Sequence, residues 1–208
     1  MRVVVIGAGG LGGPIAIAAA ASGAEVTVVD ADVVELSNLH RQVQFGMADL
    51  GRAKATALAA RIGGRGVVAR FEAGNAAELT VDADVVVDGS DDPETKFLVA
   101  DQARALGRPY VIAAALRHGG NVFAGAPGRA CYRCLFEAPP DDAATCGDSG
   151  VLGPLVGWVG GVAARRALAL GGGDLDPAGS IWVLDDLRRG GPREVRLERR
   201  RGCVCEGP

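Results

Sequence analysis

The chain has 208 residues, of which 49% are hydrophobic but only 4% aromatic, so we expect one α/β domain with a core of Ala, Val, Leu and Ile. A formal net charge of −3 gives no electrostatic basis for binding nucleic acid or an anionic membrane surface. No segment reaches the roughly 20 apolar residues of a membrane-spanning helix, and the apolar run after Met1 is too short for a secretory leader. These features favour a cytoplasmic protein.

The first 30 residues predict a strand–loop–helix–strand unit. Arg2–Ile6 and Glu25–Val29 are short and rich in β-branched residues, which is typical of buried strands. Between them we expect a loop over Gly7–Gly13 and an Ala-rich helix over Pro14–Ser22, ended by Gly23. Two strands joined by a helix normally pair in parallel with a right-handed crossover.

Helices and strands continue to alternate up to residue 113, after a polar segment at 32–49 that we expect to form a loop or a short helix. The predicted elements, in order, are Arg52–Ile62 (helix), Val67–Phe71 (strand), Ala83–Asp88 (strand), Pro93–Leu106 (helix) and Tyr110–Ala113 (strand). This alternation predicts a Rossmann-like, doubly wound sheet whose first half is parallel.

The pattern changes after residue 116. A polar segment, Cys131–Asp148, is expected to be a mobile loop, and a long apolar helix is expected over Val151–Leu170. Short strands are predicted at Gly120–Gly125, Ile181–Leu184 and Glu194–Glu198. We therefore expect a mixed or antiparallel second half of the sheet, within a single domain over residues 1–208 rather than two domains.

A glycine pattern lies between the first strand and the first helix, with Gly7, Gly9 and Gly12 at the spacing of a phosphate-binding fingerprint and Gly10 between them. Glycines let backbone N–H groups approach phosphate oxygens, and the helix N-terminus favours negative charge. Asp30 ends the second strand 23 positions after Gly7, where a carboxylate can accept hydrogen bonds from ribose hydroxyls. The pattern predicts a nucleotide site, for which NAD is the usual first hypothesis.

The polar residues that follow favour nucleotidyl transfer over hydride transfer. Asn38, Arg41 and Gln42 lie close together, and Lys54 follows them. A hydride-transfer site has no need for such cations, whereas a departing diphosphate is stabilised by Arg, Lys and a metal ion. Asp91 follows a predicted buried strand at the same sheet edge, where its carboxylate can hold Mg²⁺.

Four motifs therefore occur in order along the chain: Gly7–Gly12, Asp30–Asp32, Leu36–Gln42 with Lys54, and Asp88–Asp91. Together they resemble the MoeB/ThiF/HesA adenylyltransferases, which are relatives of the ubiquitin-activating enzymes. The resemblance covers essentially the whole chain. It implies ATP-dependent adenylation of the C-terminal carboxylate of a ubiquitin-like sulfur-carrier protein ending in Gly-Gly. Diphosphate is released, and a sulfur donor then converts the acyl-adenylate to a thiocarboxylate.

The resemblance also implies roles for individual residues. It implies that Asp30 binds ribose, that Asn38, Arg41 and Lys54 contact the ATP phosphates, and that Asp91 handles Mg²⁺. Residues 1–116 would bind the nucleotide, and 117–208 would dock the carrier and hold zinc. The complete expected nucleotide site is Gly7, Gly9, Gly10, Gly12, Asp30, Asp32, Asn38, Arg41, Gln42, Lys54 and Asp91.

In a reducing compartment the five cysteines are not expected to form a disulfide framework, so their clustering indicates metal binding or thiol chemistry. Cys131 and Cys134 have the spacing of half a tetrahedral zinc site, which Cys203 and Cys205 could complete. Many members of the resembled family carry such a zinc, although the one-residue spacing of the second pair departs from the usual pattern. Free thiols or a labile disulfide are the alternatives.

Cys146 matches a region where family members often carry a cysteine that meets the activated carrier. The alternative interpretation is that Cys146 is only a small residue in a loop.

Family members usually carry an N-terminal arm whose arginine reaches the partner subunit's ATP site, and this chain begins at its first strand. The resemblance implies a homodimer. Either another arginine such as Arg52 substitutes for the arm arginine, the arm is dispensable, or the protein is less active. His40 and His118 are interpreted as structural or surface residues, and Arg199–Arg201 as a solvated run, with binding of an acidic carrier as the alternative. Trp158 and Trp182 are expected to pack rather than to stack on a nucleobase.

Three other classes of protein remain as alternatives. The first is an NAD(P)-dependent oxidoreductase, which the combination of Asn38, Arg41, Lys54 and Asp91 disfavours. The second is a relative that activates a small molecule, a peptide or tRNA, and the cysteine pairs disfavour the tRNA branch. The third is a non-catalytic module that only docks a carrier, which the presence of Asp91 and Arg41 disfavours. The pathway, whether thiamin, molybdopterin, cysteine or a specialised metabolite, depends on the docking surface.

Overall fold

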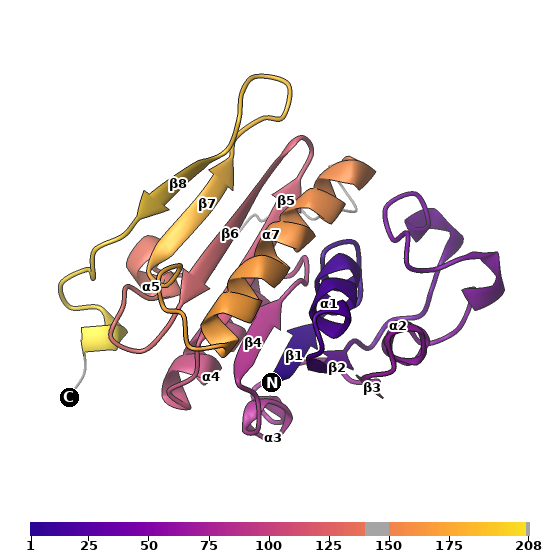
Figure 1. The fold of residues 1–208 in the computed structure, drawn as a ribbon, viewed down its shortest axis with the longest axis horizontal. Coiled ribbons are helices and arrows are strands. Elements are labelled where there is room, and N and C mark those ends of the chain that lie inside the picture. The colour runs from indigo at the N-terminus through magenta and orange to yellow at the C-terminus, as the bar shows by residue number, and fades with distance from the viewer. Residues whose placement is uncertain (140–149, 207–208) are drawn as a thin grey trace.

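The computed structural model describes residues 1–139 and 150–206, and within them the chain forms an eight-stranded sheet with helices on both faces (Figure 1). The strands are β1 (Arg2–Ile6), β2 (Glu25–Val29), β3 (Arg65–Val67), β4 (Val85–Asp88), β5 (Tyr110–Leu116), β6 (Gly119–Gly125), β7 (Ser180–Leu184) and β8 (Arg193–Arg196). The α-helices are α1 (Gly12–Ala21), α2 (Lys54–Ile62), α3 (Ala76–Thr80), α4 (Pro93–Ala105), α5 (Tyr132–Leu135) and α7 (Gly153–Gly171). Short 3₁₀ turns are η1 (Leu36–Asn38), η2 (Met47–Asp49) and η3 (Val204–Glu206).

The strand order is β3-β2-β1-β4-β5-β6-β7-β8, which confirms the predicted combination of a parallel and an antiparallel half. The first five strands of this order pair in parallel, and β5 to β8 pair in antiparallel fashion. The chain runs outward from β1 to β2 and β3 on one side, and to β4 and β5 on the other. Such a reversal leaves a crevice beyond the carboxyl ends of the central strands, where open α/β sheets bind their ligands.

The core has two layers because alternate residues of each strand point to opposite faces of the sheet. Val3 and Val5 of β1 belong to the cluster beneath α1, α2 and α7, whereas Val4 and Ile6 belong to the cluster beneath α3, α4 and α5. Strands buried on both faces read as continuous apolar runs, which is why the central strands were predictable. Trp158 of α7 packs edge-to-face on Trp182 of β7, with ring centroids 5.6 Å apart.

The predicted strand Val67–Phe71 was wrong, because β3 ends where that prediction began. Gly66 in β3 packs directly on α2, where a Cβ would lie 2.6 Å from the carbonyl oxygen of Ala55. Because this close approach requires a glycine, β3 lacks the run of β-branched residues that normally indicates a strand in the sequence. Residues 69–71 leave the sheet and instead line the cavity described below.

Two short helices were not predicted. Neither α3 nor α5 is long enough to display a helical period, and α5 lies inside the segment expected to be a loop. Cys146, also in that segment, lies outside the described residues. No helix in the described part of the chain is both long and apolar enough to cross a membrane.

Candidate functional site

A cavity of about 620 Å³ lies at the carboxyl ends of β1, β2 and β4, in the crevice that the strand order creates. Residues that are far apart in the sequence meet there, as the nucleotide-site prediction requires. The lining includes Gly7, Gly9, Gly10, Asp30, Asp32, Asn38, Arg41, Gln42, Lys54 and Asp91. Of the expected nucleotide-site residues, Gly12 alone does not line this cavity.

Gly12 has a packing role beneath the glycine loop. A Cβ at Gly12 would lie 1.8 Å from the carbonyl oxygen of Gly7, and a Cβ at Gly89 would lie 2.7 Å from the nitrogen of Gly12. Gly7 itself has a φ of +89°, a conformation that side chains disfavour. The β1–α1 loop and the loop after β4 therefore interlock at glycines. This contact brings Asp91 next to the glycine loop.

The carboxylate of Asp30 holds the loop as well as facing the cavity. Its two oxygens accept hydrogen bonds from the backbone N–H groups of Ala8 and Asp32, each at 2.7 Å. Burial raises the pKa of Asp30, and these two hydrogen bonds oppose that increase. A carboxylate has about four lone-pair positions, so Asp30 retains capacity to accept ribose hydroxyls.

The two predicted cations reach the cavity from different elements, and Arg70 lines it as well. Lys54 begins α2, is buried, and its Nζ lies 3.0 Å from a carboxylate oxygen of Asp32. Arg41 follows η1 and is half-buried, with its Nη1 3.5 Å from the Nε2 of His40. Asn38 ends η1. Three cations and an amide therefore line the same cavity as the glycine loop; Arg70 was not among the residues predicted from the sequence.

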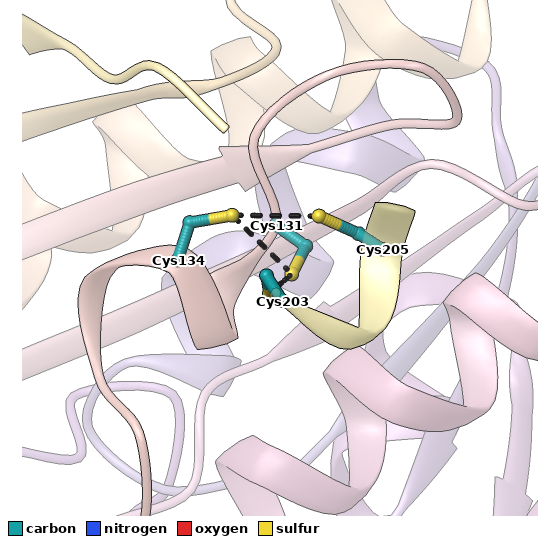
Figure 2. Close-up of side chains that lie close together, drawn as sticks. All are labelled: Cys131, Cys134, Cys203 and Cys205. Carbon is teal, nitrogen blue, oxygen red and sulfur yellow. Dashed lines mark hydrogen bonds between the residues drawn. The ribbon is translucent and has the colours of Figure 1, made fainter. Parts of the chain in front are cut away.

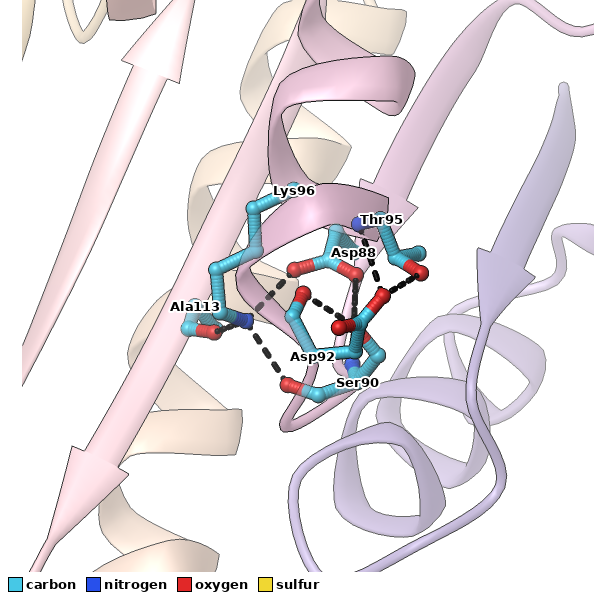
Figure 3. A network of polar contacts seen from close by, with 6 residues as sticks. All are labelled: Asp88, Ser90, Asp92, Thr95, Lys96 and Ala113. Atoms are coloured by element: carbon cyan, nitrogen blue, oxygen red, sulfur yellow. Dashed lines mark hydrogen bonds and ion pairs between the residues drawn. The ribbon is translucent and has the colours of Figure 1, made fainter. Parts of the chain in front are cut away.

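A buried polar network shapes the loop that carries Asp91 (Figure 3). The Nζ of Lys96 donates to the Asp88 carboxylate at 2.7 Å and to the carbonyl oxygens of Ser90 and Ala113 at 2.7 and 2.8 Å. The other oxygen of Asp88 accepts from the Ser90 hydroxyl at 2.6 Å. Burial raises the pKa of Asp88, and the Lys96 ammonium opposes that increase. Sequence reasoning missed Lys96, because a lysine in an amphipathic helix usually faces solvent.

A second cavity of about 400 Å³ adjoins the first and extends over β5, β6 and β7. The residues that line both cavities are Leu11, Ser90, Asp91 and Ala115. Gly119 and Gly120 form part of the second lining, and a Cβ at either would come within 2.7 Å of neighbouring atoms. Asp91 thus lies on the wall that the two cavities share.

The four predicted zinc ligands come together between α5 and the C-terminal turn η3 (Figure 2). Their sulfur atoms all lie within 4.8 Å of one another, with Cys131 to Cys203 at 3.5 Å and Cys134 to Cys205 at 3.4 Å. A tetrahedral zinc with Zn–S bonds of about 2.3 Å places its sulfurs about 3.8 Å apart. The geometry of the four thiols therefore fits zinc. The one-residue spacing is accommodated because η3 turns the chain between Cys203 and Cys205.

Arg52, named from the sequence as a substitute for the arm arginine, does not line the first cavity. Its Nη1 forms an ion pair at 2.7 Å with Asp49, a buried carboxylate that also binds Arg61. The pair stabilises the segment between η2 and α2.

A glycine loop, a carboxylate at the end of β2 and converging cations at the switch point of a doubly wound sheet are typical of nucleotide-binding α/β proteins. The chain belongs to the ThiF family, whose sequence model matches residues 1–206.

Relatives with curated names include the sulfur carrier protein adenylyltransferase of Thermus thermophilus, which is 38% identical over 98% of this chain and 81% of the relative. The SAMP-activating enzyme E1 of Haloferax volcanii is 44% identical over 81% of this chain and 66% of the relative. The adenylyltransferase and sulfurtransferase MOCS3 of Caenorhabditis briggsae is 35% identical over 95% of this chain. The chain spans 52% of that protein, about half its length.

The fold is shared with E. coli MccB. A crystal structure of MccB with ATP superposes with a TM-score of 0.84 over 99% of this chain and 67% of MccB, at 19% sequence identity. This likeness confirms the Rossmann-like fold class.

Proposed function

We propose that the protein uses ATP to adenylate the C-terminal glycine carboxylate of a ubiquitin-like sulfur-carrier protein. The observation that carries the proposal is the pair of adjoining cavities, with Asp91 on the wall that they share. The first cavity, which we call the nucleotide cavity, is lined by the glycine loop, cations and carboxylates that would bind ATP, and the second cavity would admit the end of the carrier. The names of the relatives support this substrate class.

In the proposed reaction the carrier carboxylate attacks the α-phosphorus of ATP. A carboxylate oxygen–phosphorus bond forms, the bond to the leaving oxygen breaks, and diphosphate departs with the electron pair. The attacking carboxylate is already ionised, so no general base is required. Arg41 and Lys54 stabilise the charge that develops on the diphosphate, and Asn38 orients a phosphate. Asp91 would hold Mg²⁺, which supplies further charge neutralisation when bound.

The proposal is tested by ATP–diphosphate exchange with candidate carrier proteins ending in Gly-Gly. Exchange that depends on the intact carrier, and is lost when its last glycine is removed, is the expected result. Exchange with a short peptide instead would assign the protein to a peptide-activating branch. Tight binding of NADH without binding of ATP would contradict the proposal and favour an oxidoreductase.

We also propose that the four cysteines bind one structural zinc ion. The sulfur positions support this, as does the backbone N–H of Arg200, which lies 3.4 Å from the Cys134 sulfur and can donate to a thiolate ligand. Metal analysis of the purified protein should give about one zinc per chain. The Cys134→Ser variant should lose most of it and melt at a lower temperature, because the zinc ties α5 to the C-terminal segment. A metal-free wild type with four titratable thiols would contradict the proposal.

We further propose that the protein forms a homodimer. Exposed apolar side chains in the segment between β2 and α2, among them Leu36 at 64% and Met47 at 65%, support an interface there. Sedimentation at micromolar concentration is expected to give twice the chain mass. A monomer under those conditions would contradict this proposal without affecting the adenylation site.

A further inference from the structure

The side chain of Gln44 is buried directly beneath the glycine loop. It lies in the segment between β2 and α2, and only 3% of the residue is exposed. Its Nε2 donates to the carbonyl oxygen of Ala8 at 2.8 Å and to that of Gly9 at 2.9 Å. One amide therefore uses both of its N–H bonds on two successive peptide groups of the loop.

Gly13 provides the space that this amide occupies. A Cβ at Gly13 would lie between 2.3 and 2.5 Å from the amide atoms of Gln44, which is closer than any real contact. Gly13 does not line the nucleotide cavity. Its lack of a side chain is therefore explained by the need to admit Gln44.

The hydrogen bonds of Gln44 set the direction in which the loop N–H groups point. A trans peptide is planar, so its C=O and N–H bonds point in opposite directions. Holding the carbonyls of Ala8 and Gly9 on the buried side directs the N–H groups of Gly9 and Gly10 to the other side. Gly9 and Gly10 line the nucleotide cavity. The N–H of Ala8 is in turn bound by Asp30.

The start of α1 makes this orientation consequential. Its N-cap, Leu11, makes no side-chain hydrogen bond to the helix, the N–H of Gly13 already donates to the Gly9 carbonyl at 3.0 Å, and Pro14 has no N–H. The first turn therefore offers an anion few N–H groups of its own, so those of the preceding loop matter more. A carboxylate at position 44 would repel the two carbonyls. An aliphatic side chain would remove the Gln44 donor from the Ala8 carbonyl and leave the Gly9 carbonyl with only the N–H of Gly13. Only a buried amide of this length supplies two donors here without a charge.

We propose that Gln44 is a positioning residue, seated in the space left by Gly13, that presents the N–H groups of Gly9 and Gly10 to the phosphates of the bound nucleotide. The proposal rests on the proposed function in that ATP is taken as the ligand. Gln44 does not line the nucleotide cavity and acts only through the loop.

The test is ATP binding by calorimetry to the full chain and its Gln44→Met variant, which keeps the side-chain length but has no donors. We expect binding about tenfold weaker, the effect of losing hydrogen bonds to two buried carbonyls. At saturating ATP, the KM for the carrier should stay unchanged. A general loss of structure would instead weaken ATP binding and raise the KM for the carrier together. The control is Val81→Met, at an exposed valine outside both cavities.

Gly13→Ala provides a second, independent variant, because its new methyl group would displace the amide. We expect it to weaken ATP binding to a similar degree, and the double variant Gly13→Ala with Gln44→Met to be no worse than either single change. Gln44→Asn, too short to reach both carbonyls, replaces Gln44→Met if that protein fails to fold. Wild-type affinity for ATP in folded position-44 variants would overturn the proposal for Gln44 and leave the proposed function unaffected. Failure of the wild type to bind ATP would overturn the proposed function as well.

Discussion

Replacing Asp91 with alanine is expected to lower carrier-dependent ATP–diphosphate exchange by about 100- to 1,000-fold, the usual effect of removing one group that stabilises charge in a transition state. Asp91 is exposed on the wall shared by the two cavities, and the interlocking of Gly12 with Gly89 holds its loop against the glycine loop. Its carboxylate is therefore available to a metal ion bound with the nucleotide. Because it makes little contact with the core, its removal should leave the melting temperature nearly unchanged.

The matched control for Asp91→Ala is Glu94→Ala, which removes an exposed carboxylate from the first turn of α4, three residues away. This variant should retain wild-type exchange, since Glu94 lines neither cavity. Titration with Mg²⁺ adds a second readout, because Asp91→Asn should need more Mg²⁺ than the wild type for half-maximal rate. Exchange by Asp91→Ala at the wild-type rate and Mg²⁺ requirement would remove Asp91 from the site.

Replacing Lys96 with methionine is expected to destabilise the protein by roughly 3–5 kcal/mol, because it leaves the buried Asp88 carboxylate without its cation. Asp88 is fully buried, and the side chain of Lys96 is 9% exposed. Three hydrogen-bond acceptors lose their donor at once (Figure 3). Urea unfolding at pH 7 measures the change in the free energy of unfolding. A loss below about 1 kcal/mol would show that the network does not stabilise the fold.

The pH dependence of the Lys96→Met variant follows from the pKa of Asp88. Burial already raises that pKa above the ordinary value of 3.8, and loss of the opposing Lys96 ammonium raises it further. A group whose pKa is higher in the folded than in the unfolded state favours folding when protonated. The stability deficit should therefore be smallest near pH 4 and grow as the pH rises through the folded-state pKa.

A second change isolates the charge of Asp88 from the loss of packing at Lys96. Adding Asp88→Asn to Lys96→Met removes the buried charge and keeps an acceptor for the Ser90 hydroxyl, so the double variant should regain part of the stability at pH 7. Near pH 4 the two variants should converge. Equal stability of the two at every pH would contradict a charged Asp88 as the cause.

Much of the nucleotide site could be predicted from local sequence. The spacing of Gly7, Gly9 and Gly12, with Asp30 at the end of the next strand, has a direct structural meaning, and the cavity lining includes three of these four. Gly12, also expected at the nucleotide site, does not line the cavity and packs closely on Gly7. The sequence does not distinguish a glycine that lets a ligand come close to the backbone from one that lets another backbone segment come close.

The cysteine pairs show a different limit. Their types and spacing predicted a metal site, but the narrow spacing of Cys203 and Cys205 left the closure of the tetrahedron open. The structure brings both sulfurs to the first pair, because the chain returns past β8 and turns at η3 (Figure 2). Long-range return of a terminal segment leaves no local signal.

The sequence by itself determined the order of the central elements, the glycine loop and the polar groups that gather beside it. These are local properties, set by the alternation of buried strand residues and by glycine spacing. Only the tertiary structure decided which polar side chains hold the protein's own backbone: Asp30 and Gln44 at the glycine loop, and Lys96 behind Asp91. A buried side chain whose partners lie far along the chain has no periodic signature, and its environment exists only once the sheet has formed.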